Sequence, residues 1–386
     1  MLSAHWQTAG AHVEVVTSTA YFPEDHPAVL SNKPAFVYDT DTGVRVHVLP
    51  VAYTQKMGFR QRIQAFTNFY YSAKRYAKQL ARPDIIYASS TPLTVAQLGH
   101  DLGKRWQVPW VFEAVDVWPD VPIGMGILTN PVLKSTLNHR TNKLYRSAHT
   151  IFALSPGMRE QILSHGVPPA KVHVSYNGTE PERFHPQTAI DEQVQLVYAG
   201  ALGRANAVGE LVGCWAALCD KDETVRNAAA LTIYGFGAQA EAIKRQVAEQ
   251  RERGVPISFE GKLPKAELAE ALGQFDVGIC WFADYPVLEA NSANKFYDYL
   301  AAGLPVLTNY AGWQGKVLGD HKCGLSSPQG QREAFQDNLR RLIMDAALRQ
   351  SYSTNARKLA VQQFDRRQIA ADLLRRFKRV ISPATD

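Results

Sequence analysis

The chain has 386 residues, of which 46% are hydrophobic and 20% charged, and its formal net charge is +6. This composition is typical of a globular protein and excludes an intrinsically disordered chain, while the length favours about two domains of ~150 residues each. No run approaches the ~20 apolar residues that a transmembrane helix needs, and the first residues lack the pattern of a signal peptide.

The four cysteines do not have the spacing of metal ligands. Cys214, Cys219, Cys280 and Cys323 lie among apolar residues. Free buried thiols are typical of a reducing compartment, so we expect a cytoplasmic protein without disulfides.

The first half alternates strand and helix patterns. Residues 1–8 have the pattern of the end of a helix, and residues 10–17 that of a turn and a parallel strand, so the chain begins inside a βαβ unit. Residues 23–34 are predicted as a loop. Further strands are predicted at 44–49, 83–90, 109–112, 150–154 and 172–175, and helices at 93–106, at 133–147 and after Ser155.

The segment between Asp41 and Asp84 contains no acidic residue. Two interpretations remain open: a helix at an anionic membrane surface, or a core helix with a solvated basic face. No nucleic-acid motif accompanies the segment, so we expect no nucleic-acid partner. Its basic and aromatic residues include Lys56, Arg60, Arg62, Lys74, Arg75 and Lys78, with Phe59, Phe66, Phe69, Tyr70, Tyr71 and Tyr76.

The second half repeats the alternation after a proline-bounded linker at 181–186. The alternation predicts an α/β fold with two doubly wound, Rossmann-like domains of parallel strands, at residues 1–186 and 187–360. A basic amphipathic helix within 361–386 is expected to pack back toward the first domain. Ligands of such sheets bind beyond the carboxyl ends of the strands, so we expect a site between the domains.

Three strand-end loops of the second half carry residues suited to a phosphate. Gly200 and Gly203 allow close backbone approach, and Arg204 can grip phosphate oxygens. Gly235 and Gly237 form the second loop. In the third, 288–308, a small-residue loop precedes a helix that carries Lys295 and ends before Gly303, which offers free N–H groups and a positive charge. A capped surface helix is the alternative interpretation of this loop.

In the first half, carboxylates are expected to follow the strand 109–112. Glu113, Asp116 and Asp120 could accept hydrogen bonds from sugar hydroxyls or take a proton, and turn capping is the alternative for the two aspartates. No His/Cys cluster or Asp-x-Asp pair predicts a metal site. Eight scattered histidines have no partner at catalytic spacing: His12, His100, His139, His149, His165, His173, His185 and His321.

Several motifs together resemble the family 4 glycosyltransferases of GT-B fold, in particular the bacterial branch that builds lipopolysaccharide and capsule. The resemblance covers nearly the whole chain, and its last motif is the most specific. The motifs are Phe112–Pro119 (FEAVDVWP), Ala153–Ser155, Asn177–Gly178, Tyr198–Gly203 (YAGALG) and Asn294–Val306 (NKFYDYLAAGLPV).

The resemblance implies a retaining, metal-independent transferase that moves a sugar from a UDP-sugar, as substrate and with no cofactor, to a lipid-linked or glycan acceptor. It implies that Arg204 and Lys295 hold the diphosphate and, with Asp116, carry catalysis, while Glu113 and Trp118 lie on the acceptor side. An association with the inner face of the plasma membrane follows from such an acceptor. The implied donor-binding residues are Gly200, Gly203, Tyr234, Gly235, Gly237, Lys262, Leu263, Asn291, Ser292, Asn294 and Asp298.

Two departures from the family pattern concern the donor sugar and the start of the chain. The family's Glu-x7-Glu motif has Asp298 at its second acid, but Ala290 stands at the first, with Glu289 one residue away. We therefore expect Asn291 and backbone N–H groups to contact the sugar. The family's first strand and its Gly-rich loop are missing, which indicates an incomplete start.

Two alternatives to transfer remain: a UDP-sugar 2-epimerase of the same architecture, or a nucleotide-sugar-binding subunit without activity. Retention without a nucleophile implies same-face displacement, with the leaving diphosphate taking the acceptor proton. The sequence does not identify the sugar, the acceptor or the oligomeric state.

Overall fold

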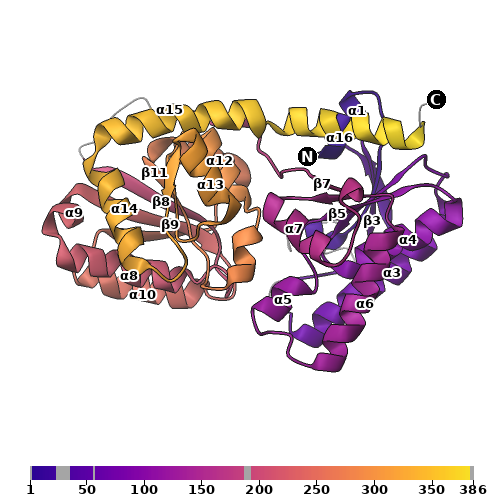
Figure 1. The fold of residues 1–386 in the computed structure, drawn as a ribbon, viewed down its shortest axis with the longest axis horizontal. Coiled ribbons are helices and arrows are strands. Elements are labelled where there is room, and N and C mark those ends of the chain that lie inside the picture. Colours follow the sequence, from indigo (N-terminus) through magenta and orange to yellow (C-terminus); the bar gives the residue numbers. More distant parts are fainter. Residues whose placement is uncertain (1, 23–34, 55–56, 187–192, 383–386) are drawn as a thin grey trace. The chain divides into compact units, whose positions relative to one another are not determined.

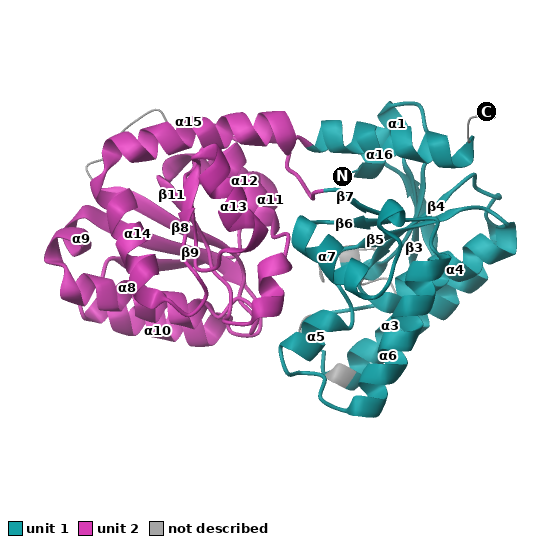
Figure 2. Cartoon of the chain, in the orientation of Figure 1, with its two compact units in different colours: residues 1–175, 366–386 teal, residues 176–365 magenta. Residues whose placement is uncertain are grey.

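A computed structural model describes residues 2–22, 35–54, 57–186 and 193–382, and it divides into two compact units. Unit 1 comprises Met1–Ser175 and Arg366–Asp386, and unit 2 comprises Tyr176–Asp365 (Figure 2). The predicted loop at 23–34 and the predicted basic residue Lys56 lie outside the described residues. Within the described part, no helix is long and apolar enough to cross a membrane.

Unit 1 contains two sheets and their covering helices (Figure 1). One sheet has the order β4-β5-β6-β7, all parallel, and the other the order β1-β3-β2, in which β2 is antiparallel. Its strands are β1 Glu14–Ser18, β2 Phe36–Asp39, β3 Arg45–Leu49, β4 Ile86–Ser90, β5 Trp110–Ala114, β6 Thr150–Ala153 and β7 Val172–Val174. Its α-helices are α1 Leu2–Thr8, α3 Phe59–Tyr76, α4 Leu93–Trp106, α5 Asp120–Gly124, α6 Pro131–Ser147, α7 Pro156–Ser164 and α16 Arg366–Ile381, and its 3-10 helices are η1 Thr19–Tyr21, η2 Ala77–Gln79 and η3 Pro169–Lys171.

Unit 2 is built on one parallel sheet of six strands in the order β10-β9-β8-β11-β12-β13. The strands are β8 Val194–Ala201, β9 Ala229–Phe236, β10 Ile257–Gly261, β11 Val277–Cys280, β12 Val306–Thr308 and β13 Gly324–Ser326. The α-helices are α8 Val208–Lys221, α9 Glu223–Ala228, α10 Ala240–Glu252, α11 Lys265–Ala271, α12 Asn294–Ala301, α13 Gly312–His321, α14 Arg332–Met344 and α15 Ala346–Gln363, and the 3-10 helices are η4 Pro181–Arg183, η5 Leu272–Gln274 and η6 Pro286–Ala290. The predicted α/β class with parallel sheets is confirmed.

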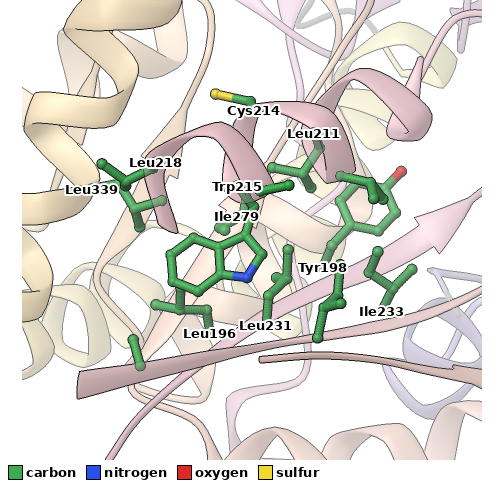
Figure 3. Close-up of a cluster of buried hydrophobic side chains, with 14 of the residues drawn as sticks. Leu196, Tyr198, Leu211, Cys214, Trp215, Leu218, Leu231, Ile233, Ile279 and Leu339 are labelled. Atoms are coloured by element: carbon green, nitrogen blue, oxygen red, sulfur yellow. The ribbon is translucent and has the colours of Figure 1, made fainter. Parts of the chain in front are cut away.

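The core of unit 2 forms where α8 crosses the sheet (Figure 3). Trp215 is 1% exposed and packs among leucine and isoleucine side chains of α8 and of the strands, and its indole Nε1 donates to Pro256 O at 3.1 Å. Period-2 alternation along β8 and β9 sends Leu196, Leu231 and Ile233 to this face. The buried apolar layer fixes the strand ends, on which the site residues lie.

Three local predictions are corrected by the strand pairing. Glu113 does not follow its strand but belongs to β5, opposite Ser89 of β4. Gly200 and Gly235 were expected in a loop and a turn, but they pair with each other at the ends of β8 and β9. The sequence predicts the end of each strand where its run of apolar side chains ends. In the structure, backbone hydrogen bonds continue the strands past these points.

Trp6 of α1 ties this helix to α16 within unit 1. It is 8% exposed, its Nε1 donates to Ala370 O at 3.0 Å, and its ring lies edge-on to Tyr87 and Phe377 at 5.1 and 5.3 Å. We expect Trp6→Phe to lower the free energy of unfolding by about 1–2 kcal/mol, since one hydrogen bond and part of the ring are lost. Urea unfolding followed by circular dichroism measures this. The matched Trp106→Phe variant, at a partly exposed side chain, should change stability by less than about 0.5 kcal/mol, and equal losses would contradict the anchoring role.

Candidate functional site

Lys295 projects from the first turn of α12 toward the end of β8. Its Nζ donates to the Tyr198 hydroxyl at 2.8 Å and to Asn206 Oδ1 at 3.4 Å, and lies 4.0 Å from the centre of the Tyr198 ring. The ring of Phe282 lies 5.2 Å away. Within the described residues no carboxylate forms an ion pair with this ammonium group. Lys295 is thus a cation held by neutral groups, a state suited to receiving an anion.

Burial lowers the pKa of Lys295 to about 8. Cys280 also interacts electrostatically with Lys295, and burial raises the pKa of its thiol to about 12. The thiol therefore stays neutral at physiological pH and does not balance the charge. A bound anion would supply the missing countercharge and return the pKa of Lys295 toward its usual range.

The glycines predicted for donor binding let the strand ends and loops come into close contact. A Cβ on Gly200 would lie 2.9 Å from Lys295 Cε, so the missing side chain makes room for the lysine. A Cβ on Gly235 would lie 2.3 Å from Gly200 O. Gly237 has a φ of +147°, and a Cβ there would lie 2.6 Å from Leu202 O. Gly235 and Gly237 therefore act on the site by shaping the loop that follows β8.

That loop presents Arg204 to solvent. Asn206 N and Ala207 N both donate to Gly203 O, at 2.9 and 3.2 Å, and Ala283 N donates to Ala205 O at 2.9 Å. Arg204 itself is exposed, and it has no hydrogen bond or ion pair with another residue that the structure describes. The structure links the two predicted cations through Asn206, which contacts Lys295 and lies two positions after Arg204.

The loop before α12 is held by hydrogen bonds to its carbonyl groups. Asn177 Nδ2 donates to Ser292 O at 2.9 Å, and Trp313 Nε1 donates to Asn291 O at 2.7 Å. The Ser292 hydroxyl lies 2.6 Å from the Tyr297 hydroxyl. Because the carbonyls point to these partners, the loop is fixed in one conformation just before the first turn of α12.

The Asn291 amide is used within this loop. Its Oδ1 accepts from Ala293 N at 3.2 Å, and its Nδ2 donates to Leu288 O. Ala290 is 8% exposed in η6, whereas Asn294 is exposed at the start of α12. Asn291 N also donates to Leu288 O at 3.1 Å, so the exposed side chain of Asn294 is a polar group that this stretch presents to solvent.

Asp298 lies one turn beyond Lys295 on α12. Its Oδ1 accepts from the Thr179 hydroxyl at 2.8 Å, and Thr179 is fully buried. The carboxylate at the second acid position of the family motif thus anchors α12 to the segment 176–180 of the same unit.

A polar cavity of about 460 Å³ opens on the sheet face beside β9 and β10. Tyr234 and Phe275 form its aromatic wall, with ring centres 6.1 Å apart. At the nearby end of β9, Phe236 is 49% exposed and Lys262 Nζ lies 4.9 Å from its ring, with Leu263 next in the chain. The full lining is Gln195, Thr232, Tyr234, Glu260, Gly273, Gln274 and Phe275.

In unit 1, Asp116 lies beyond the end of β5. Its Oδ2 accepts from the Thr91 hydroxyl, which follows β4, at 3.1 Å. Asp116 keeps an exposed surface, and the protein atoms packed around its carboxyl raise its pKa, which the Thr91 hydrogen bond opposes. Trp118 is partly buried in the same segment. Glu113 is 8% exposed inside β5, and burial raises its pKa.

Sequence reasoning missed a histidine–aspartate pair in unit 1. His165 Nε2 lies 2.9 Å from Asp120 Oδ2, and His165 Nδ1 lies 2.8 Å from Asn142 Oδ1. The prediction that the scattered histidines lack partners is therefore wrong for His165. These residues come from α5, α6 and the end of α7, so only the fold brings them together. The pair holds α5, and with it the segment that carries Asp116 and Trp118.

Glu14, the first residue of β1, contacts two histidines. His12 Nε2 lies 3.4 Å from Glu14 Oε1, and His47 Nε2 lies 3.3 Å from Glu14 Oε2. The expectation for His12 is therefore also wrong. Within the described residues, no group of three or more histidine, cysteine or acidic side chains is arranged to hold a metal ion.

Two family models match almost all of the chain. Residues 1–178 match the model described as "Glycosyl transferase 4-like domain", and residues 180–359 match "Glycosyl transferases group 1". One curated relative is a GDP-mannose-dependent alpha-mannosyltransferase of Mycobacterium tuberculosis (strain CDC 1551 / Oshkosh). It is 25% identical over 288 residues, which are 72% of this chain and 68% of the relative.

Solved structures share the fold at low sequence identity. The sucrose-phosphate synthase of Thermosynechococcus elongatus has a TM-score of 0.78 and 17% identity over 98% of this chain and 91% of its own. An Anabaena protein in complex with UDP and glucose has a TM-score of 0.67 and 13% identity over 95% of this chain and 100% of its own. The predicted GT-B architecture, with two Rossmann-like domains, is confirmed.

Proposed function

Because this chain belongs to the group 1 glycosyltransferases of GT-B fold, we propose that it moves a sugar from a UDP-sugar to a lipid-linked or glycan acceptor. The proposed sugar is a hexose or an N-acetylhexosamine, transferred with retention and without a metal. The proposed setting is the synthesis of cell-surface polysaccharide at the inner face of the plasma membrane. The observation that carries the proposal is Lys295, a partly buried cation that forms no ion pair with a carboxylate of the described residues, beside a glycine-shaped loop with the exposed Arg204.

In this proposal the diphosphate binds between the loop 201–207 and the start of α12. Lys295 and Arg204 neutralise the charge that develops on the leaving diphosphate, and the first N–H groups of α12 add a positive dipole end. The leaving phosphate oxygen takes the acceptor proton as the new glycosidic bond forms on the same face. In unit 1, we propose that Asp116 contacts a sugar hydroxyl, since its carboxylate is partly exposed and already positioned by Thr91.

A direct comparison of UDP with GDP tests the nucleobase of the donor. The Anabaena protein was solved with UDP, whereas the curated relative depends on GDP-mannose. We expect calorimetric titration to give tighter binding for UDP than for GDP. Tighter binding of GDP would contradict the UDP assignment and leave the transferase in place.

An assay of donor hydrolysis and sugar transfer distinguishes a transferase from a non-catalytic subunit. Release of free sugar from the bound donor, or its transfer to an acceptor, supports the enzyme. Binding of UDP without release or transfer would favour a non-catalytic nucleotide-sugar-binding subunit. The comparisons give no support to a 2-epimerase, because both family models are those of glycosyltransferases.

The affinity for a UDP-sugar should fall as the pH rises above about 8. In the free protein Lys295 loses its proton near this pH, because burial lowers its pKa to about 8. The bound diphosphate favours the protonated lysine, so binding takes up a proton above this pH, and the affinity falls by up to about tenfold per pH unit. Below about pH 7 this dependence disappears, because Lys295 is already charged.

Calorimetric titration with UDP-glucose between about pH 6.5 and about pH 9 measures this linkage, since its esterified diphosphate does not titrate in that range. Lys295→Met removes the titrating group, so its weaker affinity should be independent of pH over the same range. A pH-independent affinity of the unmodified protein would show that Lys295 does not contact the diphosphate.

A further inference from the structure

Three large apolar side chains lie in solvent in one short segment of unit 1. Ile127, Val132 and Leu133 are 55%, 74% and 42% exposed. They lie at the turn between α5 and α6 and in the first turn of α6. Because exposed apolar residues usually occur singly, their concentration in one turn indicates a surface that meets a partner.

The segment is ordered, so the exposure is a property of the fold. Ile127 N and Leu128 N both donate to Pro122 O at 2.9 Å, which closes the turn after α5. Asn130 caps α6, and its Oδ1 accepts from Leu133 N at 3.0 Å. The capped first turn therefore fixes Val132 and Leu133 in positions where they stay exposed.

Helix α6, which carries Val132 and Leu133, is basic along its length. No acidic residue occurs between Asp120 and Glu160. The side chains of Lys134, Arg140, Lys143 and Arg146 make no ion pair with another residue that the structure describes, and the last three are exposed. The exposed apolar side chains at the start of α6 are thus followed along the helix by basic side chains that no described acidic residue neutralises.

The exposed face of α3 in the same unit has a similar composition. Ile63 and Tyr71 are 48% and 65% exposed, Arg60 and Arg75 are exposed on the same helix, and Lys78 is exposed in η2, which follows it. Both α3 and α6 pack against α4. Lys74 does not belong to this face, because its Nζ donates to Tyr70 and Asp101.

We propose that Ile127, Val132 and Leu133, together with Arg140, Lys143 and Arg146, form a docking surface for an anionic lipid bilayer. The inference rests on the proposed function in that it supplies the contact with a membrane-held acceptor. Apolar side chains enter the boundary between headgroups and acyl chains, while Lys and Arg side chains bind the phosphates.

A bilayer fits this surface better than a macromolecular partner does. The three apolar side chains, in the first turn of α6 and in the turn before it, supply far less than the ~800 Å² that each partner of a stable protein interface buries. Nucleic acid would use the cations but would leave Val132 and Leu133 in water. A lipid surface uses both groups at once.

Flotation with lipid vesicles tests the surface in the absence of any nucleotide. The unmodified protein should bind vesicles of phosphatidylcholine with about 30% phosphatidylglycerol and should bind pure phosphatidylcholine much more weakly. Val132→Ser/Leu133→Ser should lower the partition coefficient by about tenfold, because the inserted apolar area is lost. Arg140→Gln/Lys143→Gln should lower it by about tenfold or more, and added salt should reduce this difference.

The matched control is Met344→Ser/Val361→Ser in unit 2, where the original side chains are 45% and 42% exposed. Its binding to vesicles should equal that of the unmodified protein. The proposal is overturned if the unmodified protein does not bind vesicles that contain phosphatidylglycerol, or if the Val132/Leu133 variant binds them as tightly as the control does. The proposal would also be overturned if the unmodified protein formed a dimer without lipid and the Val132/Leu133 variant were a monomer. The surface would then bind a second copy of the chain.

Vesicle binding and UDP binding test the docking surface and the proposed function independently of each other. Titration with UDP on the same variants should be unchanged, because all four substituted residues of the docking surface lie in unit 1 and the donor-binding residues lie in unit 2. Vesicle binding without UDP binding would contradict the proposed function and retain the surface. UDP binding without vesicle binding would do the reverse.

Discussion

Replacing Lys295 with alanine is expected to lower kcat/KM for sugar transfer by about 10²- to 10³-fold. The reason is electrostatic: the ammonium group lies among Tyr198, Asn206 and aromatic rings, and in the described part of the chain no carboxylate pairs with it. Its interaction with a diphosphate should strengthen as the sugar–phosphate bond breaks and charge moves onto the leaving group. Loss of the ammonium should therefore lower kcat as well as raise KM.

Initial rates with a UDP-sugar, measured over a range of donor concentrations, separate these two parameters. Lys316→Ala is the matched control, because Lys316 is exposed on α13 and paired with Asp320 at 2.8 Å, and it should leave both parameters unchanged. Arg204→Ala should also lower kcat/KM for sugar transfer. A loss of less than about tenfold for both site variants (~1.4 kcal/mol) would show that neither stabilises the leaving diphosphate.

The sequence predicted those elements whose ends are marked by local chemistry. The helix predicted at 93–106 is α4, Leu93–Trp106, and Gly303 follows the end of α12 with a φ of +72°. The resemblance to family 4 glycosyltransferases is confirmed by the two family models. Periodicity and capping residues act over a few positions, which is why they can be recognised in a single sequence.

Contacts between distant residues could not be predicted in this way. The pairing of Gly200 with Gly235 and the contact of His165 with Asp120 each depend on how separate strands or helices are placed. The basic segment around α3 illustrates the same limit. Its sequence indicates a cationic helix, but only the structure distinguishes Lys74, bound to Asp101, from the exposed Arg75.

Ala290 remains the clearest departure from the family pattern. The structure buries it in η6, and the neighbouring Asn291 uses its amide to hold the loop. The expectation that backbone N–H groups contact the donor sugar therefore stays a prediction. Asn291 N and Ala293 N are hydrogen-bonded within the loop, so such a contact would have to come from other N–H groups, including those of the first turn of α12.

Gly235→Ala is expected to destabilise unit 2 by about 3 kcal/mol and to weaken UDP-sugar binding by more than about tenfold. A Cβ at this position would lie 2.3 Å from Gly200 O and 2.9 Å from Leu202 Cγ. A backbone oxygen cannot turn away as a flexible side chain can, so β8 and β9 must separate where they are paired. The shift would move Gly200, which packs against Lys295 Cε, and so would displace the proposed diphosphate ligand.

Urea unfolding and titration with UDP-glucose measure the two effects on one protein sample. Gly213→Ala is the control, because outside the nearby backbone of α8 no atom of the described residues lies within 4 Å of an added Cβ, and alanine favours the helix. It should leave UDP-glucose binding unchanged and raise stability by up to about 1 kcal/mol. If Gly235→Ala lost stability but bound UDP-glucose normally, the contact between the two strand ends would support the fold alone. The donor site would then have to lie away from Gly200 and Lys295, because these residues cannot keep their positions once the strand ends have separated.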